Sequence, residues 1–189
     1  MPPTTHPPSK QNIRQLTMIA LMSALLCILG PWALPLPFSP VPLSLCTLGI
    51  CLAVLVLGTR AGVLCVLLYL LLGLIGLPVF TGFTGGPARL FGPTGGYLLG
   101  YLFLALISGS VADIRPHRRS FQLLGMFAGT LTCYIIGTLW LSFQLSLTLP
   151  EALALGVLPY LPGDFVKTLL ALHLGNKLRK ALLRAKLLV

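Results

Sequence analysis

Acidic residues are nearly missing from this chain of 189 residues, which contains only Asp113, Glu151 and Asp164. Charged residues of both signs make up 8% of the sequence and hydrophobic residues make up 56%. In soluble globular domains about a quarter of the residues are charged. The scarcity of charge therefore excludes an ordinary soluble domain and predicts an integral membrane protein.

Sequence patterns typical of metal, phosphate and nucleic-acid binding are also missing. The five cysteines are isolated within apolar stretches, without a Cys-x-x-Cys pair, so we predict packing roles and no metal site. No glycine pair is followed by the Lys-Ser or Lys-Thr that grips phosphates, so we predict no ATPase activity in this chain and no cofactor. The net charge of +10 does not indicate nucleic-acid binding, because the basic residues flank apolar runs instead of alternating with aromatic residues on a polar face.

The sequence instead contains long runs without Lys, Arg, Asp or Glu, and about 20 apolar residues suffice for a membrane-spanning helix. Five prolines between positions 31 and 42 mark a connection between helices, because proline removes a backbone donor. The predicted spans are about Leu16–Leu34, Leu43–Leu57, Ala61–Leu77, Pro93–Ala112, Phe121–Leu145 and a sixth that begins between Glu151 and Asp164. The expected fold is all-α, with six transmembrane helices in residues 15–189 and a disordered cytoplasmic tail in residues 1–14.

Positive charge is distributed unevenly over this topology. Eleven of the 13 basic residues fall on the side of the two termini: Lys10, Arg14, Arg60, Arg115, Arg118, Arg119, Lys177, Arg179, Lys180, Arg184 and Lys186. Cytoplasmic loops carry the excess of Lys and Arg, so both termini are predicted to be cytoplasmic in a bacterial inner membrane. The two exceptions, Arg89 and Lys167, are predicted to lie toward the outer face.

Asp164 and Lys167 lie within "YLPGDFVKT" (Tyr160–Thr168), near the predicted start of the sixth span. Residues three apart share one face of a helix, so both side chains can enter one pocket. A charge within a span is expensive and is usually paired or functional. One alternative is that Asp164 only caps the helix and neutralises Lys167. Arg89 would add a second cation at the same membrane face, which favours a site for an anionic ligand.

Arg89 lies within "FTGFTGGPARLFGPTGGYLLGY" (Phe80–Tyr101), which contains seven glycines. Glycine allows a close approach of the backbone to a ligand, and irregular backbone at membrane depth is tolerated where it lines a cavity. We therefore predict that this loop, including Gly95 and Gly96, forms a lid or wall of a ligand pocket. The alternative is a flexible surface loop.

Four stretches resemble the BioY family, the biotin-specific S components of energy-coupling-factor (ECF) vitamin transporters. They are "LPFSPVPLSLCTLG" (Leu36–Gly49), "LLYLLLGLIGLPVFTGFTGG" (Leu67–Gly86), "GPTGGYLLGY" (Gly92–Tyr101) and "PYLPGDFVK" (Pro159–Lys167). The resemblance implies a six-helix membrane protein that captures biotin from outside. It also implies three partners: a transmembrane coupling subunit and two cytoplasmic ATPase subunits.

By the same resemblance, Asp164 and Lys167 match the ligand-contacting pair of the family. Asp164 is expected to accept hydrogen bonds from the cyclic urea, and Lys167 or Arg89 is expected to hold the valerate carboxylate. Tyr97, Phe80 and Phe38 are candidates to pack on the fused rings, or are plain helix packing. The chain departs from the family pattern at Cys46, where many members have Gln, and the segment around Arg89 has no clear family match.

Ala20 and Ala24 of the first span are small residues four positions apart, a spacing that lets another helix approach closely in lipid. The resemblance implies that they dock the coupling subunit.

Three rival functions remain open from the residues alone. An integral membrane enzyme would need a nucleophile with a base, or a metal cluster, which the scattered histidines do not supply. An S component for thiamine or riboflavin shares every feature except the family stretches. A purely structural subunit leaves the charges near the outer face unexplained.

Overall fold

The computed structural model describes residues 10–34, 37, 39, 41–116, 118–185 and 187. In chain order its elements are α1 (Lys10–Leu29), β1 (Ala33–Leu34), β2 (Leu43–Ser44), α2 (Cys46–Leu57), α3 (Thr59–Leu74), α4 (Pro87–Leu90), α5 (Gly95–Ile114), α6 (Arg119–Leu145), α7 (Leu149–Gly156) and α8 (Leu161–Arg184). Among the described residues, the two short strands are the only sheet. The prediction of a helical fold built from apolar helices is therefore confirmed.

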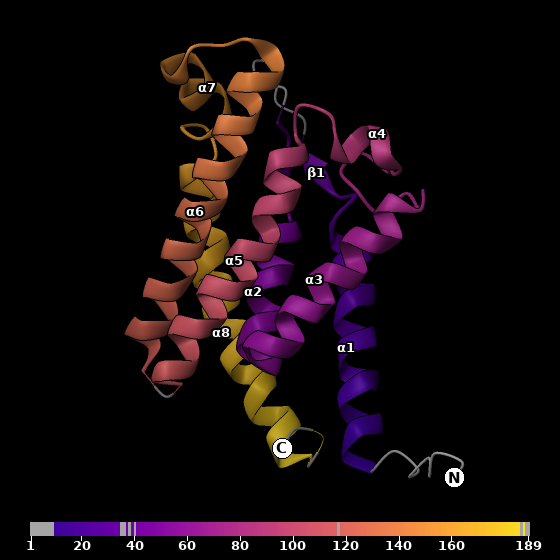
Figure 1. Cartoon of the computed structure of the whole chain (residues 1–189). Coiled ribbons are helices and arrows are strands. Elements are labelled where there is room, and N and C mark those ends of the chain that lie inside the picture. Colours follow the sequence, from indigo (N-terminus) through magenta and orange to yellow (C-terminus); the bar gives the residue numbers. More distant parts are fainter. Residues whose placement is uncertain are drawn as a thin grey trace, which may run out of the picture.

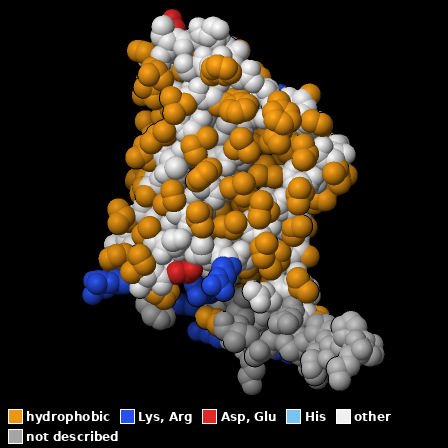
Figure 2. All heavy atoms as spheres, viewed as in Figure 1, with side chains coloured by type: hydrophobic (Ala, Val, Ile, Leu, Met, Phe, Trp, Pro, Cys, Tyr) orange, Lys and Arg blue, Asp and Glu red, His pale blue; other side chains and the backbone are white. Residues whose placement is uncertain are grey.

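The long helices lie side by side and run between two ends of the molecule (Figure 1). α1 begins and α8 ends at one end, while α4, α7 and β1 lie at the other. Lys and Arg side chains gather at the end with the two termini, and apolar side chains cover the sides of the visible face (Figure 2). This distribution of charge and apolar surface is typical of a protein that crosses a bilayer.

By length and composition, α5 and α6 are each able to cross a membrane. α7 and α8 pass the same test together, as a pair bent by 49°. Apolar parts of α1, α2 and α3 are shorter than a full span. α1 begins at Lys10, inside the segment predicted as a tail, and residues 1–9 lie outside the described part of the chain.

The proline cluster between α1 and α2 contains a feature that the sequence did not reveal. β1 and β2 pair antiparallel, with Ala33 opposite Ser44 and Leu34 opposite Leu43. The first helix therefore ends at Leu29, earlier than predicted. This two-stranded ribbon brings the carbonyl group of Ser44 on β2 to Lys167 near the start of α8.

The glycine-rich loop after α3 is tied to the helices around it. Gly86 has a φ of 91°, a conformation that favours glycine, and its N–H donates to the carbonyl of Gly73 at 2.7 Å. The indole Nε1 of Trp140 on α6 donates to the carbonyl of Gly92 at 2.9 Å. The loop is therefore fastened to both α3 and α6.

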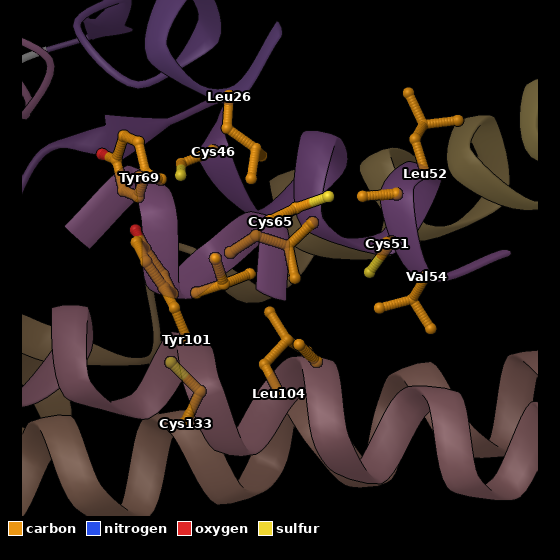
Figure 3. Close-up of a cluster of buried hydrophobic side chains, with 14 of the residues drawn as sticks. Leu26, Cys46, Cys51, Leu52, Val54, Cys65, Tyr69, Tyr101, Leu104 and Cys133 are labelled. Carbon is orange, nitrogen blue, oxygen red and sulfur yellow. The ribbon is translucent and has the colours of Figure 1, made fainter. Parts of the chain in front are cut away.

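The core between the helices contains four of the five cysteines, drawn in Figure 3 among buried apolar side chains. These are Cys46, Cys51, Cys65 and Cys133, and all five cysteines are free thiols. Among the described residues, no group of His, Cys, Asp and Glu is arranged to hold a metal ion. The cysteines act as small packing residues in this core.

Candidate functional site

The site begins in the first turns of α8, where Pro162 suits the helix start. The backbone N–H of Asp164 donates to the carbonyl of Tyr160 at 2.8 Å, so Asp164 is already in regular helix. Lys167 Nζ lies 2.7 Å from Asp164 Oδ1, and both residues are buried. The predicted contact across one helix face is thus present.

Three other elements complete the hydrogen bonding of this pair. Lys167 Nζ also donates to the carbonyl of Ser44 on β2 at 2.6 Å. The hydroxyl of Tyr134 on α6 donates to Asp164 Oδ2, and Thr47 Oγ1 on α2 lies 3.5 Å from Asp164 Oδ1. A buried charge is tolerated when it is paired and hydrogen-bonded in this way. The pair therefore fixes α8 against β2, α2 and α6.

A cavity of about 40 Å³ adjoins the ion pair. Four tyrosines contribute to its lining: Tyr97, Tyr101, Tyr134 and Tyr160. The Tyr97 hydroxyl donates to the carbonyl of Gly156 at 3.1 Å, and the Tyr160 hydroxyl donates to the carbonyl of Val41. We call this cavity, with its charged pair and phenol rings, the polar chamber. Aromatic walls with a few convergent polar groups are typical of small-molecule sites.

Arg89 and Phe80 line a second cavity of about 30 Å³. Tyr97, Tyr101 and Ser44 line both this cavity and the polar chamber, so the two cavities adjoin. Pockets for drug-sized ligands measure about 300–1,000 Å³. The side chains around both cavities must therefore move to admit a ligand of that size.

Arg89 reaches the carbonyl of Thr81 with Nη2 at 3.5 Å. Among the described residues, the only salt bridge is the one between Lys167 and Asp164. The two cavities thus hold two cations and one carboxylate, which leaves one positive charge without an anionic partner in the described part of the chain. An anionic group of a ligand would balance it.

The remaining predicted site residues lie elsewhere. Phe38 lies outside the described residues. Gly95 and Gly96 lie where α5 meets α6, and a Cβ on Gly96 would come within 2.2 Å of Trp140 Cβ. A Cβ on Gly95 would come within 1.8 Å of the carbonyl oxygen of Leu90, so close packing explains the lack of a side chain at both positions. Ala20 and Ala24 are both exposed on α1.

Sequence reasoning missed Tyr134, Tyr160, Ser44 and Thr47, which hold or surround the ion pair. Each is a polar residue within or next to an apolar stretch, and polar residues in spans are often functional. Tyr160 immediately precedes α8, but Ser44, Thr47 and Tyr134 belong to β2, α2 and α6, so their spacing along the chain gives no sign that they converge on Asp164.

The geometry can be compared with known proteins. The sequence profile of the BioY family matches residues 4–184. This chain belongs to the BioY family. The membership confirms the family predicted from the four sequence stretches.

Relatives in the BioY family are similar over most of their length. The chain is 40% identical to "Biotin transporter BioY2" of Lactococcus lactis subsp. cremoris, over 90% of this chain and 93% of the relative. It is 34% identical to "Biotin transporter BioY" of Thermotoga maritima, over 89% of this chain and 97% of that one.

A solved structure is also similar in fold. It is a crystal structure of the S-component for biotin from an ECF-type ABC transporter, with a TM-score of 0.85 and 33% sequence identity. The match covers 93% of this chain and 95% of that chain. The two chains therefore share their fold over most of their length.

Proposed function

We propose that this chain is the substrate-binding S component of a vitamin transporter and captures biotin at the extracytoplasmic face. The observation that carries the proposal is the buried Asp164–Lys167 pair with Arg89 in the adjoining cavity, in a chain that shares its fold with an S component for biotin. Relatives named as biotin transporters favour biotin over thiamine or riboflavin, and favour a transporter over an enzyme.

The proposed topology has six membrane helices, α1, α2, α3, α5, α6 and α8, with both termini in the cytoplasm of a bacterium. The common end of the two terminal helices and the basic side chains gathered there support this orientation (Figures 1 and 2). α2, with 12 residues, is about 18 Å long, so it crosses only part of a hydrocarbon layer of about 30 Å. The ribbon and the glycine-rich loop occupy the outer end, where the ligand would enter.

The ligand chemistry follows from the charges. Biotin has a cyclic urea with two N–H donors and a valerate carboxylate. Asp164 accepts hydrogen bonds through its carboxylate, so it is assigned to the urea. Lys167 or Arg89 holds the valerate carboxylate. Tyr97, Phe80 and Phe38 pack on the fused rings.

Import would be driven by a transmembrane coupling subunit and two ATPase subunits, since this chain has no phosphate-binding loop. Ala20 and Ala24 support docking of the coupling subunit, because both are exposed on the side of α1 and leave room for a helix to approach.

Equilibrium binding of labelled biotin to the purified chain tests the proposal. Asp164→Asn and Lys167→Ala are each expected to weaken binding by about tenfold or more, because the first removes the negative charge and one acceptor oxygen and the second removes the ammonium donor. Glu151→Gln and Lys180→Ala are matched controls at exposed positions and should bind as the parent chain does. Thermal unfolding of each variant separates a lost site from a lost fold. Full binding by both site variants, or equal competition by riboflavin, contradicts the proposal.

The methyl ester of biotin identifies the cation that holds the valerate group. The variant that removes this cation weakens binding of biotin but leaves binding of the uncharged ester nearly unchanged. Arg89→Ala and Lys167→Ala are compared in this way.

A further inference from the structure

A groove of about 230 Å³ lies between α6 and α8 and shares Asp164 with the polar chamber. Phe127, Leu131, Leu161 and Phe165 give it apolar, largely exposed walls. We call it the α6–α8 groove. It is several times larger than either cavity of the site.

Tyr134 and Asp164 line both the polar chamber and the α6–α8 groove. The hydrogen bond from the Tyr134 hydroxyl to Asp164 Oδ2 therefore forms part of the wall between the two spaces. On the chamber side, Asp164 Oδ1 accepts from Lys167 at 2.7 Å and lies 3.5 Å from Thr47 Oγ1. Both carboxylate oxygens are already engaged.

A carboxylate offers about four lone-pair sites and Lys167, Thr47 and Tyr134 use three of them, so a ligand that donates two N–H groups to Asp164 must replace at least one donor. Lys167 lies on the same helix as Asp164 and is also held by the carbonyl of Ser44 at 2.6 Å. Tyr134 lies on another helix, and Asp164 is the only hydrogen-bond acceptor of its hydroxyl in the described part of the chain. Thr47 Oγ1 is a distant donor at 3.5 Å, and of the two close donors Tyr134 has fewer other hydrogen bonds than Lys167.

Tyr134 also has space to move into. Its ring borders the α6–α8 groove, whereas Tyr97 and Tyr160 do not border it and bind backbone carbonyls with their hydroxyls. A displaced Tyr134 ring would move from the polar chamber into the α6–α8 groove. Its movement would also enlarge a chamber that is too small for a drug-sized ligand.

We propose that Tyr134 is a place-holder for the ligand. Its hydroxyl occupies Asp164 Oδ2 in the ligand-free chain and is displaced into the α6–α8 groove when an N–H donor of the ligand arrives. This inference rests on the proposed function, in which Asp164 binds such a donor. The displacement also adds a source of specificity. If a compound displaces Tyr134 but has no N–H donor of its own, Asp164 Oδ2 is left buried and unpaired.

Tyr134→Phe tests the place-holder. The ligand-free variant should unfold at a lower temperature, because Asp164 Oδ2 loses its donor. Biotin should bind about tenfold more tightly, because the ligand no longer competes with the Tyr134 hydroxyl. Tyr160→Phe removes another buried hydroxyl from the same chamber and should lower stability without tightening binding. Unchanged or weaker binding by Tyr134→Phe overturns the inference.

A second variant fills the groove. Thr130→Leu places a larger side chain beside Tyr134 and should weaken biotin binding by hindering the displacement. Adding Tyr134→Phe should reduce this loss in part, because the smaller side chain no longer has to leave Asp164, whereas its ring must still move into the groove. Thr132→Leu, two positions along α6 and outside the groove lining, is the matched control. Equal losses with and without the Tyr134 hydroxyl contradict the place-holder.

The two proposals fail in different ways. If the parent chain does not bind biotin, or Asp164→Asn binds it fully, the proposed function fails. If the parent chain binds biotin through Asp164 and Tyr134→Phe does not bind it more tightly, only the place-holder fails.

Discussion

The two faces of α6 are packed differently. On the face toward α5, glycines bring the helices into direct contact. A Cβ on Gly100 would come within 2.8 Å of Cys133 Sγ, and a Cβ on Gly129 would come within 2.8 Å of the carbonyl oxygen of Leu104. Small residues at such contacts allow close approach of the two backbones. This face has no room for movement.

The face of α6 toward α8 is held at fewer points. Near the end with the termini, Gln122 and Asn176 form a reciprocal amide pair, with Asn176 Nδ2 2.8 Å from Gln122 Oε1. Farther along, the Tyr134–Asp164 hydrogen bond joins the helices beside the α6–α8 groove. The proposed ligand-binding groups therefore lie at the interface that has space, on the opposite side of α6 from the tight interface with α5.

The largest loss of stability is expected from a substitution at the tightly packed interface between α5 and α6. In Gly96→Ala the new Cβ would lie 2.2 Å from Trp140 Cβ, so α5 and α6 would have to separate. Overpacking of this kind costs about 1–3 kcal/mol, and we expect the upper end of that range because the neighbours are close to the backbone. Thermal unfolding in detergent measures the loss. Leu106→Ala, at an exposed position of α5, is the control and should change stability much less.

An intermediate loss of stability is expected when one partner of the Gln122–Asn176 amide pair is removed. Gln122→Leu removes one partner and leaves Asn176 with a missing hydrogen bond, at a cost of about 1–3 kcal/mol. Asn176 lies 12 residues after Asp164, or about 18 Å along α8. Biotin affinity should therefore change little while the unfolding temperature falls.

The double variant Gln122→Leu/Asn176→Leu provides the control for this prediction. It removes both amides, so it should be more stable than Gln122→Leu despite the second substitution. A large loss of biotin affinity in Gln122→Leu would contradict the separation of the Gln122–Asn176 amide pair from the proposed binding site.

Contacts within one helix could be predicted from the sequence. The pair Asp164 and Lys167 was expected from the spacing of three on a helix, and the structure places the two charges 2.7 Å apart. The apolar runs likewise predicted the positions of α5 and α6 closely. In each case the deciding interaction is local, so periodicity and spacing are enough.

Contacts between elements could not be predicted in this way. The bond from Tyr134 to Asp164 joins residues 30 positions apart, and no periodicity connects them. The absence of a Cβ at Gly96 was interpreted as space for a ligand, but in the structure it is space for Trp140. The sequence shows that a close approach occurs there and does not show which partner approaches.

The smallest loss of stability is expected from a substitution that widens the α6–α8 groove. The rings of Phe127 and Phe165 border the α6–α8 groove with centroids 5.8 Å apart, and Phe165 is 51% exposed. An aromatic pair adds about 0.5–1.5 kcal/mol beyond its buried area, so Phe165→Ala should cost less stability than Gly96→Ala. Because the groove would be wider, Tyr134 should be displaced as easily as before, and biotin affinity should be maintained or slightly raised. Unfolding temperature and biotin titration check both expectations, and a loss as large as that of Gly96→Ala would show that the two faces of α6 are equally tight.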